Sequence, residues 1–332
     1  MKLWGVAMVR NEADIIEAFV RHNLTVLDGL VVVDHGSADA TPRILAALCA
    51  ERLPLVVLAS EAVGYLQAEI VTSAVREAFA RLRADAVFPL DADEFLRVRV
   101  PAELVAALAA LPPGHFGRIA WPTYVPPLDG APDDIVALLR ATRRCDAKLP
   151  LAQRVQGKVV LTGHFARNPM ATLTMGNHGV MLGRDPRTSP SMPHVDLPAR
   201  LVEVCHVPVR SARQFVIKTV IKRMARVAAN RDYPPASPIH AALDAIRRGA
   251  PLSPAAMLST HVVVDDPAFA AAWTERDAGA DSFLGDIRLR YTDAPPADPM
   301  PVVLAAVERL VRRAVEARAA ADVRVPARDE PA

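Results

Sequence analysis

Short apolar runs alternate with longer helical patterns along the first part of the chain, and this alternation restricts the fold more than any other feature. Runs typical of strands occupy residues 3–9, 29–34, 55–58 and 86–90, and helical patterns lie between them at residues 14–27, about 41–51 and 66–83. Strands that alternate with helices form βαβ units, whose strands pair in parallel. We therefore predict an α/β fold with a mostly parallel sheet flanked by helices.

The pattern changes after residue 101. Prolines interrupt any long element between residues 112 and 132, which predicts a loop-rich region. Short strand-like runs follow at residues 117–121, 158–162 and 201–204, and helical patterns at 211–231 and 302–322, whereas the stretch between these two helices shows no assignable periodicity. We expect an α/β domain at residues 1–210 and a mainly helical extension at 211–332.

Composition argues against several kinds of partner. The 39 basic and 37 acidic side chains leave a net charge of +2, so we expect no nucleic-acid partner. The three cysteines lack the spacing of a zinc site or a disulfide framework. No apolar run reaches the roughly 18 residues of a membrane span, and the first run is too short for a signal peptide. We expect a cytoplasmic protein, and an Arg-rich C-terminal helix allows peripheral contact with the inner face of a membrane.

Three carboxylates directly follow the apolar run at residues 86–90, namely Asp91, Asp93 and Glu94. Two acids separated by one residue can point toward a common divalent cation and leave coordination positions for phosphate oxygens. Such a cation would hold a nucleoside diphosphate and neutralise its charge as it departs. The alternative interpretation is a helix cap or a solvated acidic loop.

Two further polar segments follow the first two apolar runs. They are Arg10-Asn11-Glu12 and the turn that contains Asp34, Gly36 and Asp39. Because parallel sheets bind ligands at the carboxyl ends of their strands, these segments are expected to share an edge with Asp91 and Asp93. Carboxylates there suit a nucleobase or a ribose hydroxyl, and Gly36 permits close backbone approach. The alternative is that Asp, Gly and Ser simply form a turn.

Together these segments resemble the family 2 glycosyltransferases of the GT-A fold, a Rossmann-related architecture. The resemblance covers about residues 2–97, and its motifs in chain order are Asn11-Glu12, the turn Asp34-x-Gly-Ser-x-Asp39, Gln67, and Asp91-x-Asp93-Glu94-Phe95. It implies an inverting, Mn²⁺- or Mg²⁺-dependent transferase that moves a sugar from a nucleoside-diphosphate sugar, a UDP-sugar being favoured. By analogy, the acceptor would be a glycan or lipid-linked hydroxyl in cell-surface polysaccharide synthesis.

A second tract is similar to the later part of the same family, and it supplies further candidates. The resemblance implies catalytic roles for Asp93, Asp91 and Glu94, and a metal site of Asp91 and Asp93 with His206 and His178, since neutral imidazole suits Mn²⁺. A lone histidine is more often a packing residue. The nucleotide-sugar residues that it implies are Arg10, Asn11, Glu12, Asp34, Gly36, Asp39, Gln67, Lys158, Arg210 and Lys218.

The sequence also departs from the family pattern. His35 follows Asp34 where a second acid is common, and no Glu-Asp-x-x-Leu block marks a catalytic base. The base therefore stays open among Asp133, Asp134, Asp196 and Glu203. Two alternatives remain: a nucleotidyltransferase, whose usual early Gly-rich loop is absent here, and a non-catalytic scaffold that binds nucleotide sugars.

Overall fold

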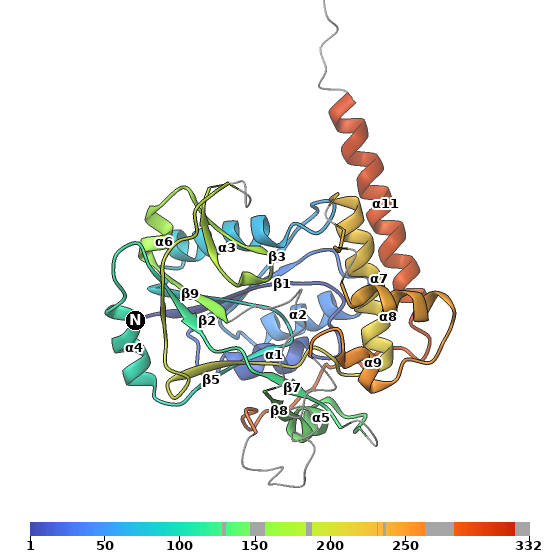
Figure 1. Cartoon of the computed structure of the whole chain (residues 1–332), viewed down its shortest axis with the longest axis horizontal. Coiled ribbons are helices and arrows are strands. Elements are labelled where there is room, and N and C mark those ends of the chain that lie inside the picture. The colour runs from blue at the N-terminus through green and yellow to red at the C-terminus, as the bar shows by residue number, and fades with distance from the viewer. Residues whose placement is uncertain are drawn as a thin grey trace, which may run out of the picture.

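A seven-stranded sheet forms the centre of the computed structural model, which describes residues 1–127, 131–146, 157–183, 188–230, 232–234, 237–262 and 282–322 (Figure 1). Its strands lie in the order β12 (His194–Asp196), β6 (Phe116–Ile119), β9 (Lys158–Thr162), β4 (Ala86–Leu90), β1 (Leu3–Val9), β2 (Gly29–Asp34) and β3 (Leu55–Ala59). The pairs from β4 to β3 are parallel, whereas β9 runs antiparallel to both of its neighbours. The sheet is thus mostly parallel.

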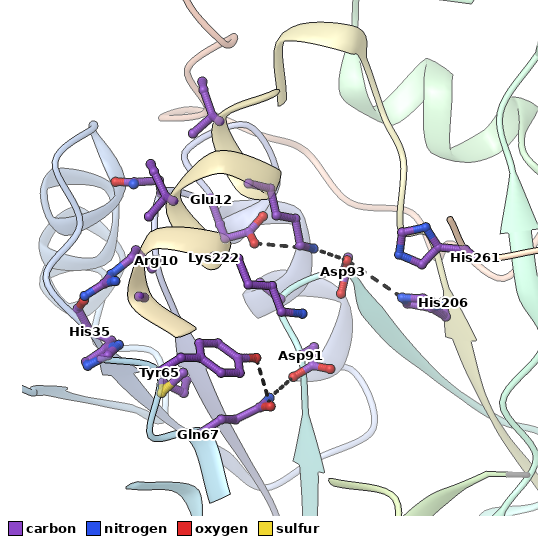
Figure 2. Close-up of a pocket in the computed structure, with 17 residues that line it drawn as sticks. Arg10, Glu12, His35, Tyr65, Gln67, Asp91, Asp93, His206, Lys222 and His261 are labelled. Carbon is purple, nitrogen blue, oxygen red and sulfur yellow. Dashed lines mark hydrogen bonds and ion pairs between the residues drawn. The ribbon is translucent and has the colours of Figure 1, made fainter. Parts of the chain in front are cut away.

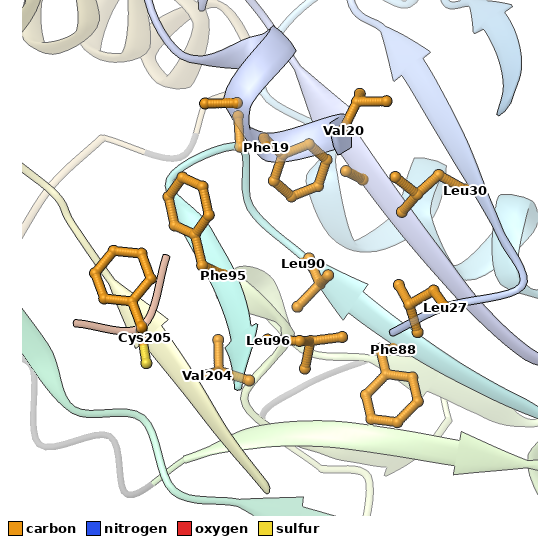
Figure 3. Packing of buried hydrophobic residues seen from close by; sticks show 14 of the residues in the cluster. Phe19, Val20, Leu27, Leu30, Phe88, Leu90, Phe95, Leu96, Val204 and Cys205 are labelled. Atoms are coloured by element: carbon orange, nitrogen blue, oxygen red, sulfur yellow. The ribbon is translucent and has the colours of Figure 1, made fainter. Parts of the chain in front are cut away.

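Alternate residues of the central strands enter two separate hydrophobic clusters. In β1, Ala7 and Val9 belong to the cluster that contains α1 (Ile16–Asn23) and α2 (Thr41–Ala50), while Val6 and Met8 face α3 (Gln67–Arg81). This alternation follows from the period of two in a strand, and it buries the sheet on both faces. Figure 3 shows the first cluster, in which Phe19 of α1 lies near Leu90 and Phe95.

A second sheet begins at Glu94, the last residue of the acidic block formed by Asp91, Asp93 and Glu94. It has the order β5 (Glu94–Val98), β13 (Val202–His206), β7 (Thr123–Val125) and β8 (Arg143–Cys145), and His206 is paired with Glu94 across β13 and β5. A hairpin of β10 (Ala171–Leu173) and β11 (Val180–Leu182), a 3-10 turn at Met175–Asn177 and three short helices complete this part: α4 (Pro101–Ala109), α5 (Ile135–Ala141) and α6 (Gly163–Arg167). The strand pairing brings His206 to the acidic block.

The C-terminal part is helical, with α7 (Ala212–Ala228), α8 (Ile239–Arg247), α9 (Pro254–Leu258) and α11 (Met300–Asp322). Ser211 caps α7 by accepting a hydrogen bond from the backbone nitrogen of Gln214 at 3.1 Å. Ile217 and Ile221 of α7 pack against Val303 and Ala306 of α11, and the two helices lie side by side in Figure 1. In the described part of the chain, no helix is long and apolar enough to cross a membrane.

The predicted fold class is confirmed, since helices flank a large, mostly parallel sheet. The predicted strands at residues 3–9, 29–34, 86–90 and 158–162 have the observed bounds. Helices α4, α5, α6, α8 and α9 and strands β5, β7, β8 and β10 to β12 were not predicted. The division at residue 210 stays a prediction; α7, which follows it, contributes side chains to the same pocket as the sheet.

Candidate functional site

A pocket lies at the carboxyl ends of β1 and β4, with α7 opposite them (Figure 2). Parallel strands end at a common edge, which is why residues distant in sequence meet here. The polar side chains on the sheet side are Arg10, Asn11, Glu12, His35, Tyr65, Gln67, Asp91 and Asp93. Lys218 and Lys222 come from α7, and His206 and His261 complete the polar part of the lining.

Asp91 is held from two sides. Its Oδ1 accepts a hydrogen bond from the Gln67 side-chain nitrogen at 2.6 Å, and its Oδ2 accepts one from the Lys158 ammonium at 2.9 Å. The backbone nitrogen of Asp91 donates to Glu94 Oε2 at 2.9 Å. Glu94, the third carboxylate of the acidic block, therefore stabilises the turn between β4 and β5.

Asp93 is buried and faces cationic and aromatic groups. Its Oδ2 forms an ion pair with the Lys218 ammonium and lies 3.8 Å from Nε2 of His206. Burial would raise the pKa of Asp93, but the charge of Lys218, supported by that of Arg210, outweighs burial and holds the pKa below its ordinary value. Asp93 is thus an ionised carboxylate inside the pocket.

Glu94 and Lys158 lie beneath the pocket and do not line it. Lys158 is fully buried, and its ammonium lies 2.7 Å from Glu94 Oε1 and donates to the Gly176 carbonyl oxygen at 2.7 Å. The Trp121 ring nitrogen also donates to Glu94 Oε1, at 2.7 Å. Burial raises the pKa of Glu94 above its ordinary value, and the charge of Lys158 opposes this shift. These contacts make both residues supports of Asp91.

Three histidines lie beside the acidic block, two of them in contact with Trp121 and the third in contact with His206. His206 stacks on Trp121 with ring centroids 4.4 Å apart, His178 meets Trp121 edge-on at 4.8 Å, and His261 lies 5.9 Å from His206. Burial lowers the pKa of His178 and of His261 to about 3 and that of His206 well below its ordinary value. All three are therefore neutral near pH 7, but only His206 and His261 line the pocket.

Arg210 joins the loop before α7 to the loop after β1. Its guanidinium contacts Glu12 at 2.6 Å and Asp14 at 2.6 Å, and its side chain is only 2% exposed. Lys218 lies 3.7 Å from the other oxygen of Glu12. Arg210 does not line the pocket, whereas Glu12 and Lys218 do.

The turn after β2 is held by its own side chains. Asp34 accepts hydrogen bonds from the backbone nitrogen and the hydroxyl of Ser37, and Asp39 accepts from the backbone nitrogens of Ala13 and Thr41. Gly36 has φ +73° and faces the Arg313 guanidinium, which lies 2.7 Å from the position a Cβ would take. Asp34, Gly36 and Asp39 therefore shape the turn without lining the pocket.

Arg10 and Asn11 connect this turn to the pocket. Nε of Arg10 donates to the His35 carbonyl oxygen at 2.6 Å, and Oδ1 of Asn11 accepts from the Ala38 backbone nitrogen at 2.6 Å. Asn11 has φ 55°, a left-handed conformation that asparagine tolerates better than most residues. Both residues line the pocket at the end of β1, and their role in binding a nucleotide stays a prediction.

The four carboxylates considered for the base lie elsewhere. Asp133 and Asp134 line a neighbouring pocket, and Asp134 caps α5. Asp196 pairs with Arg118 at the surface. Glu203 is buried among the guanidinium groups of Arg97, Arg99 and Arg144. The base is therefore not assigned to any of them.

Several pocket residues were not predicted from the sequence: His35, Tyr65, Lys222 and His261. Lys222 could have been found, because it follows Lys218 by four residues and so lies on the same face of α7. His261 had no such signal, since it follows α9 and reaches the pocket only through tertiary packing. Its Nδ1 lies 2.7 Å from the Thr260 hydroxyl.

Donor atoms suited to a divalent cation are present in the pocket. Asp91, Asp93 and His206 offer carboxylate oxygens and a neutral imidazole, and Nδ1 of His206 is buried without a hydrogen-bond partner. Within the described ranges, no group of three or more His, Cys, Asp and Glu side chains has the geometry of a metal site. Lys218 and Lys158 are paired with the two aspartates, so these residues fit a metal only if the ion displaces those contacts.

No protein-family model and no curated protein sequence matches the chain. Among solved structures, the mannosyltransferase PcManGT from Pyrobaculum calidifontis, in complex with GDP-Man and Mn²⁺, is 16% identical, with 95% of this chain and 86% of that chain covered and a TM-score of 0.37. TarS from S. aureus (residues 1–349) is 14% identical over 72% of this chain and 69% of that one, with a TM-score of 0.34.

A third similar structure is glucosyl-3-phosphoglycerate synthase from Mycobacterium tuberculosis, in complex with Mn²⁺, UDP and glucosyl-3-phosphoglycerate. It is 15% identical, with 71% of this chain and 82% of that chain covered and a TM-score of 0.34. Similarity at this level carries no argument about activity, which has to come from the pocket itself.

Proposed function

We propose that the protein is a family 2 glycosyltransferase of the GT-A type, which transfers a sugar with inversion from a nucleoside-diphosphate sugar to an acceptor hydroxyl. The observation that carries the proposal is the arrangement of charge in one pocket: Asp91 and Asp93 face Lys218 and Lys222 across the carboxyl ends of β1 and β4. Paired carboxylates can bind a divalent cation, and the ammonium groups suit the diphosphate.

Asp91, Asp93 and His206 would hold Mn²⁺ or Mg²⁺. We choose His206 over His178 because only His206 lines the pocket and lies 3.8 Å from Asp93. A bound divalent ion supplies positive charge that stabilises a departing diphosphate. The ionised state of Asp93, favoured by its lowered pKa, keeps this carboxylate available as a ligand at neutral pH.

The chain's other residues would bind and orient the donor. Arg10, Asn11 and Glu12 line the end of the pocket beside the turn after β2, where we place the nucleoside, and Asp34, Gly36 and Asp39 would shape that end. Gln67 and Lys158 would orient Asp91, and Arg210 would hold Glu12. A UDP-sugar donor, a glycan or lipid-linked acceptor and a cytoplasmic location remain predictions from the sequence.

Calorimetric binding of UDP, GDP and dTDP in the presence of Mn²⁺ tests the proposal. We expect one nucleotide to bind, and Asp93→Ala to abolish metal-dependent binding without unfolding the protein. Asp196→Ala removes a carboxylate whose side chain is 65% exposed and is the matched control. Unchanged nucleotide affinity in Asp93→Ala would remove the central claim.

Two alternative functions can be distinguished from a glycosyltransferase by the products that are released. A nucleotidyltransferase would release pyrophosphate from a nucleoside triphosphate, whereas a glycosyltransferase releases a nucleoside diphosphate, commonly also by slow transfer of the sugar to water. A non-catalytic scaffold would bind the nucleotide sugar and release neither. Chromatographic analysis of UDP-, GDP- and dTDP-sugars incubated with the protein and Mn²⁺ therefore separates the three.

A further inference from the structure

Within the described residues, Lys222 differs from Lys158 and Lys218 in having no carboxylate partner within 4.0 Å. Lys218 pairs with Asp93, and Lys158 pairs with Asp91. Across the described ranges, no ion pair within 4.0 Å involves the ammonium of Lys222, although its side chain lines the pocket. A largely buried charge without a partner is costly, so such a charge suits a ligand of opposite sign.

A chain of contacts orients Lys222 toward the same place as Asp91. Its ammonium lies over the Tyr65 ring, 5.3 Å from the centroid. The Tyr65 hydroxyl donates to Gln67 Oε1 at 2.9 Å, and Gln67 donates in turn to Asp91 at 2.6 Å. Figure 2 shows the Lys222 side chain directed into the space between Tyr65, Asp91 and Asp93. The cation and the carboxylates therefore face one small volume.

The side chain stays protonated there. Tyr65 raises the pKa of Lys222 more than burial lowers it, and Tyr233, Asp91 and Asp93 raise it further. An ammonium is attracted electrostatically to the face of an aromatic ring and carries three hydrogen-bond donors. Lys222 is therefore a fixed positive charge with hydrogen-bond donors to spare.

Resting on the proposed function, we propose that Lys222 contacts the diphosphate of the donor and stabilises the charge that develops on it as the sugar leaves. The bond between the anomeric carbon and the β-phosphate oxygen breaks, and its electron pair stays on that oxygen. The acceptor oxygen forms the new bond to the anomeric carbon and releases its proton to water. Lys222 meets the oxygen that gains charge, so its contribution is larger in the transition state than in the bound donor.

The test is the variant Lys222→Met, which removes the charge and keeps most of the apolar stem. We expect kcat for the active nucleotide sugar to fall on the order of 100-fold, with a smaller loss in donor affinity. Lys222→Arg, which keeps the charge, is expected to recover part of the rate. The matched control is Arg213→Met, which removes a charge from an exposed position on the same helix outside the pocket and should keep the full rate.

A second measurement uses the wild-type protein and does not depend on the folding of a variant. Reductive methylation followed by peptide mass spectrometry reports whether the Lys222 amine is covered. We expect UDP with Mn²⁺ to protect Lys222 and uridine with Mn²⁺ to leave it reactive, because only UDP carries the diphosphate.

The outcomes separate this inference from the proposed function. If the wild-type protein turns over a donor while Lys222→Met keeps its kcat, the inference is overturned and the proposed function stands. Equal reactivity of Lys222 with UDP and with uridine also overturns it. If the wild-type protein neither binds nor turns over any nucleotide sugar, the proposed function fails and this role of Lys222 fails with it.

Discussion

Gln67 donates its side-chain amide to Oδ1 of Asp91 at 2.6 Å, which links the first residue of α3 to the carboxylate at the end of β4. The Gln67 carbonyl oxygen accepts from the Tyr65 hydroxyl at 2.9 Å and from the Gly176 backbone nitrogen at 3.0 Å. The amide can adopt only one orientation, because its oxygen must accept and its nitrogen must donate. Three segments of the chain thus fix the direction of one carboxylate.

Gln67→Ala should weaken metal binding without removing a ligand. Groups that orient a metal ligand typically contribute about 10- to 100-fold in metal affinity, and we expect a loss of this size. Titration of Mn²⁺ in the presence of UDP, followed by electron paramagnetic resonance, measures it. Glu77→Ala, on the exposed face of the same helix, is the control. Equal affinities in the two variants would show that Gln67 does not orient Asp91.

Arg210→Met is expected to destabilise the fold strongly. The change leaves Glu12 and Asp14 without the guanidinium that contacts both at 2.6 Å in a buried position. Loss of one partner from a buried ion pair costs about 3–5 kcal/mol. Chemical denaturation measures this free energy of unfolding.

The control for Arg210 is Arg118→Met. Arg118 pairs with Asp196, whose side chain is 65% exposed, so the loss should be no more than about 1 kcal/mol. Similar losses of unfolding free energy in the two variants would contradict a structural role for Arg210. They would favour instead the direct contact with the nucleotide-sugar donor that the sequence predicted.

The strand ends were the predictable part of the site. Asp91, Asp93, Arg10 and Asn11 directly follow strands whose apolar runs are visible in the sequence, and parallel pairing alone brings strand ends together. His261 could not be predicted in this way, because its approach to His206 depends on how the segment after α9 packs.

At the turn after β2, the sequence alone could not show whether the aspartates stabilise the turn or bind a ligand. Asp34 and Asp39 both accept backbone hydrogen bonds, which is what turn and cap residues do, and the same residue types suit a ribose or a base. The antiparallel pairing of β9 with β4 could not be predicted either, because an apolar run of five residues does not show in which direction the strand will run in the sheet. Lys158 reaches Asp91 only because of that placement.

Buried histidines should make the fold sensitive to mild acid. Burial lowers the pKa of His35 to about 4 and of His178 and His261 to about 3, against roughly 6.5 in an unfolded chain. Below about pH 6.5 the unfolded chain therefore binds protons that the folded chain does not, so the stability present above this pH is lost as the pH falls toward the folded values. Each histidine costs at most about 1.4 kcal/mol per pH unit in this window.

Unfolding free energies measured from about pH 8 to about pH 5 would show this loss, since most carboxylates titrate lower. His178→Gln should give a shallower dependence, because it removes one of the titrating groups. His194→Gln, at an exposed position, should leave the slope unchanged. A stability that stays constant down to about pH 5 would contradict the neutral state assigned to these histidines.

Lys158 and Glu94 form a fully buried ion pair at 2.7 Å, and its two members should be strongly coupled. Lys158→Met leaves Glu94 without a cation, so we expect a loss of about 3–5 kcal/mol in the free energy of unfolding. Glu94→Gln should cost less, because Lys158 keeps Asp91 at 2.9 Å and the Gly176 carbonyl oxygen at 2.7 Å. The double variant removes both buried charges together.

A double-mutant cycle by urea denaturation tests this coupling. The double variant should be more stable than the sum of the two single losses implies, by roughly 1–3 kcal/mol, because it does not leave Glu94 as an unpaired buried charge. Additive losses would mean that Glu94 is satisfied by the Trp121 ring nitrogen and the Asp91 backbone nitrogen alone. In that case Lys158 would act on Asp91 only, and Lys158→Met should still weaken Mn²⁺ binding while Glu94→Gln should not.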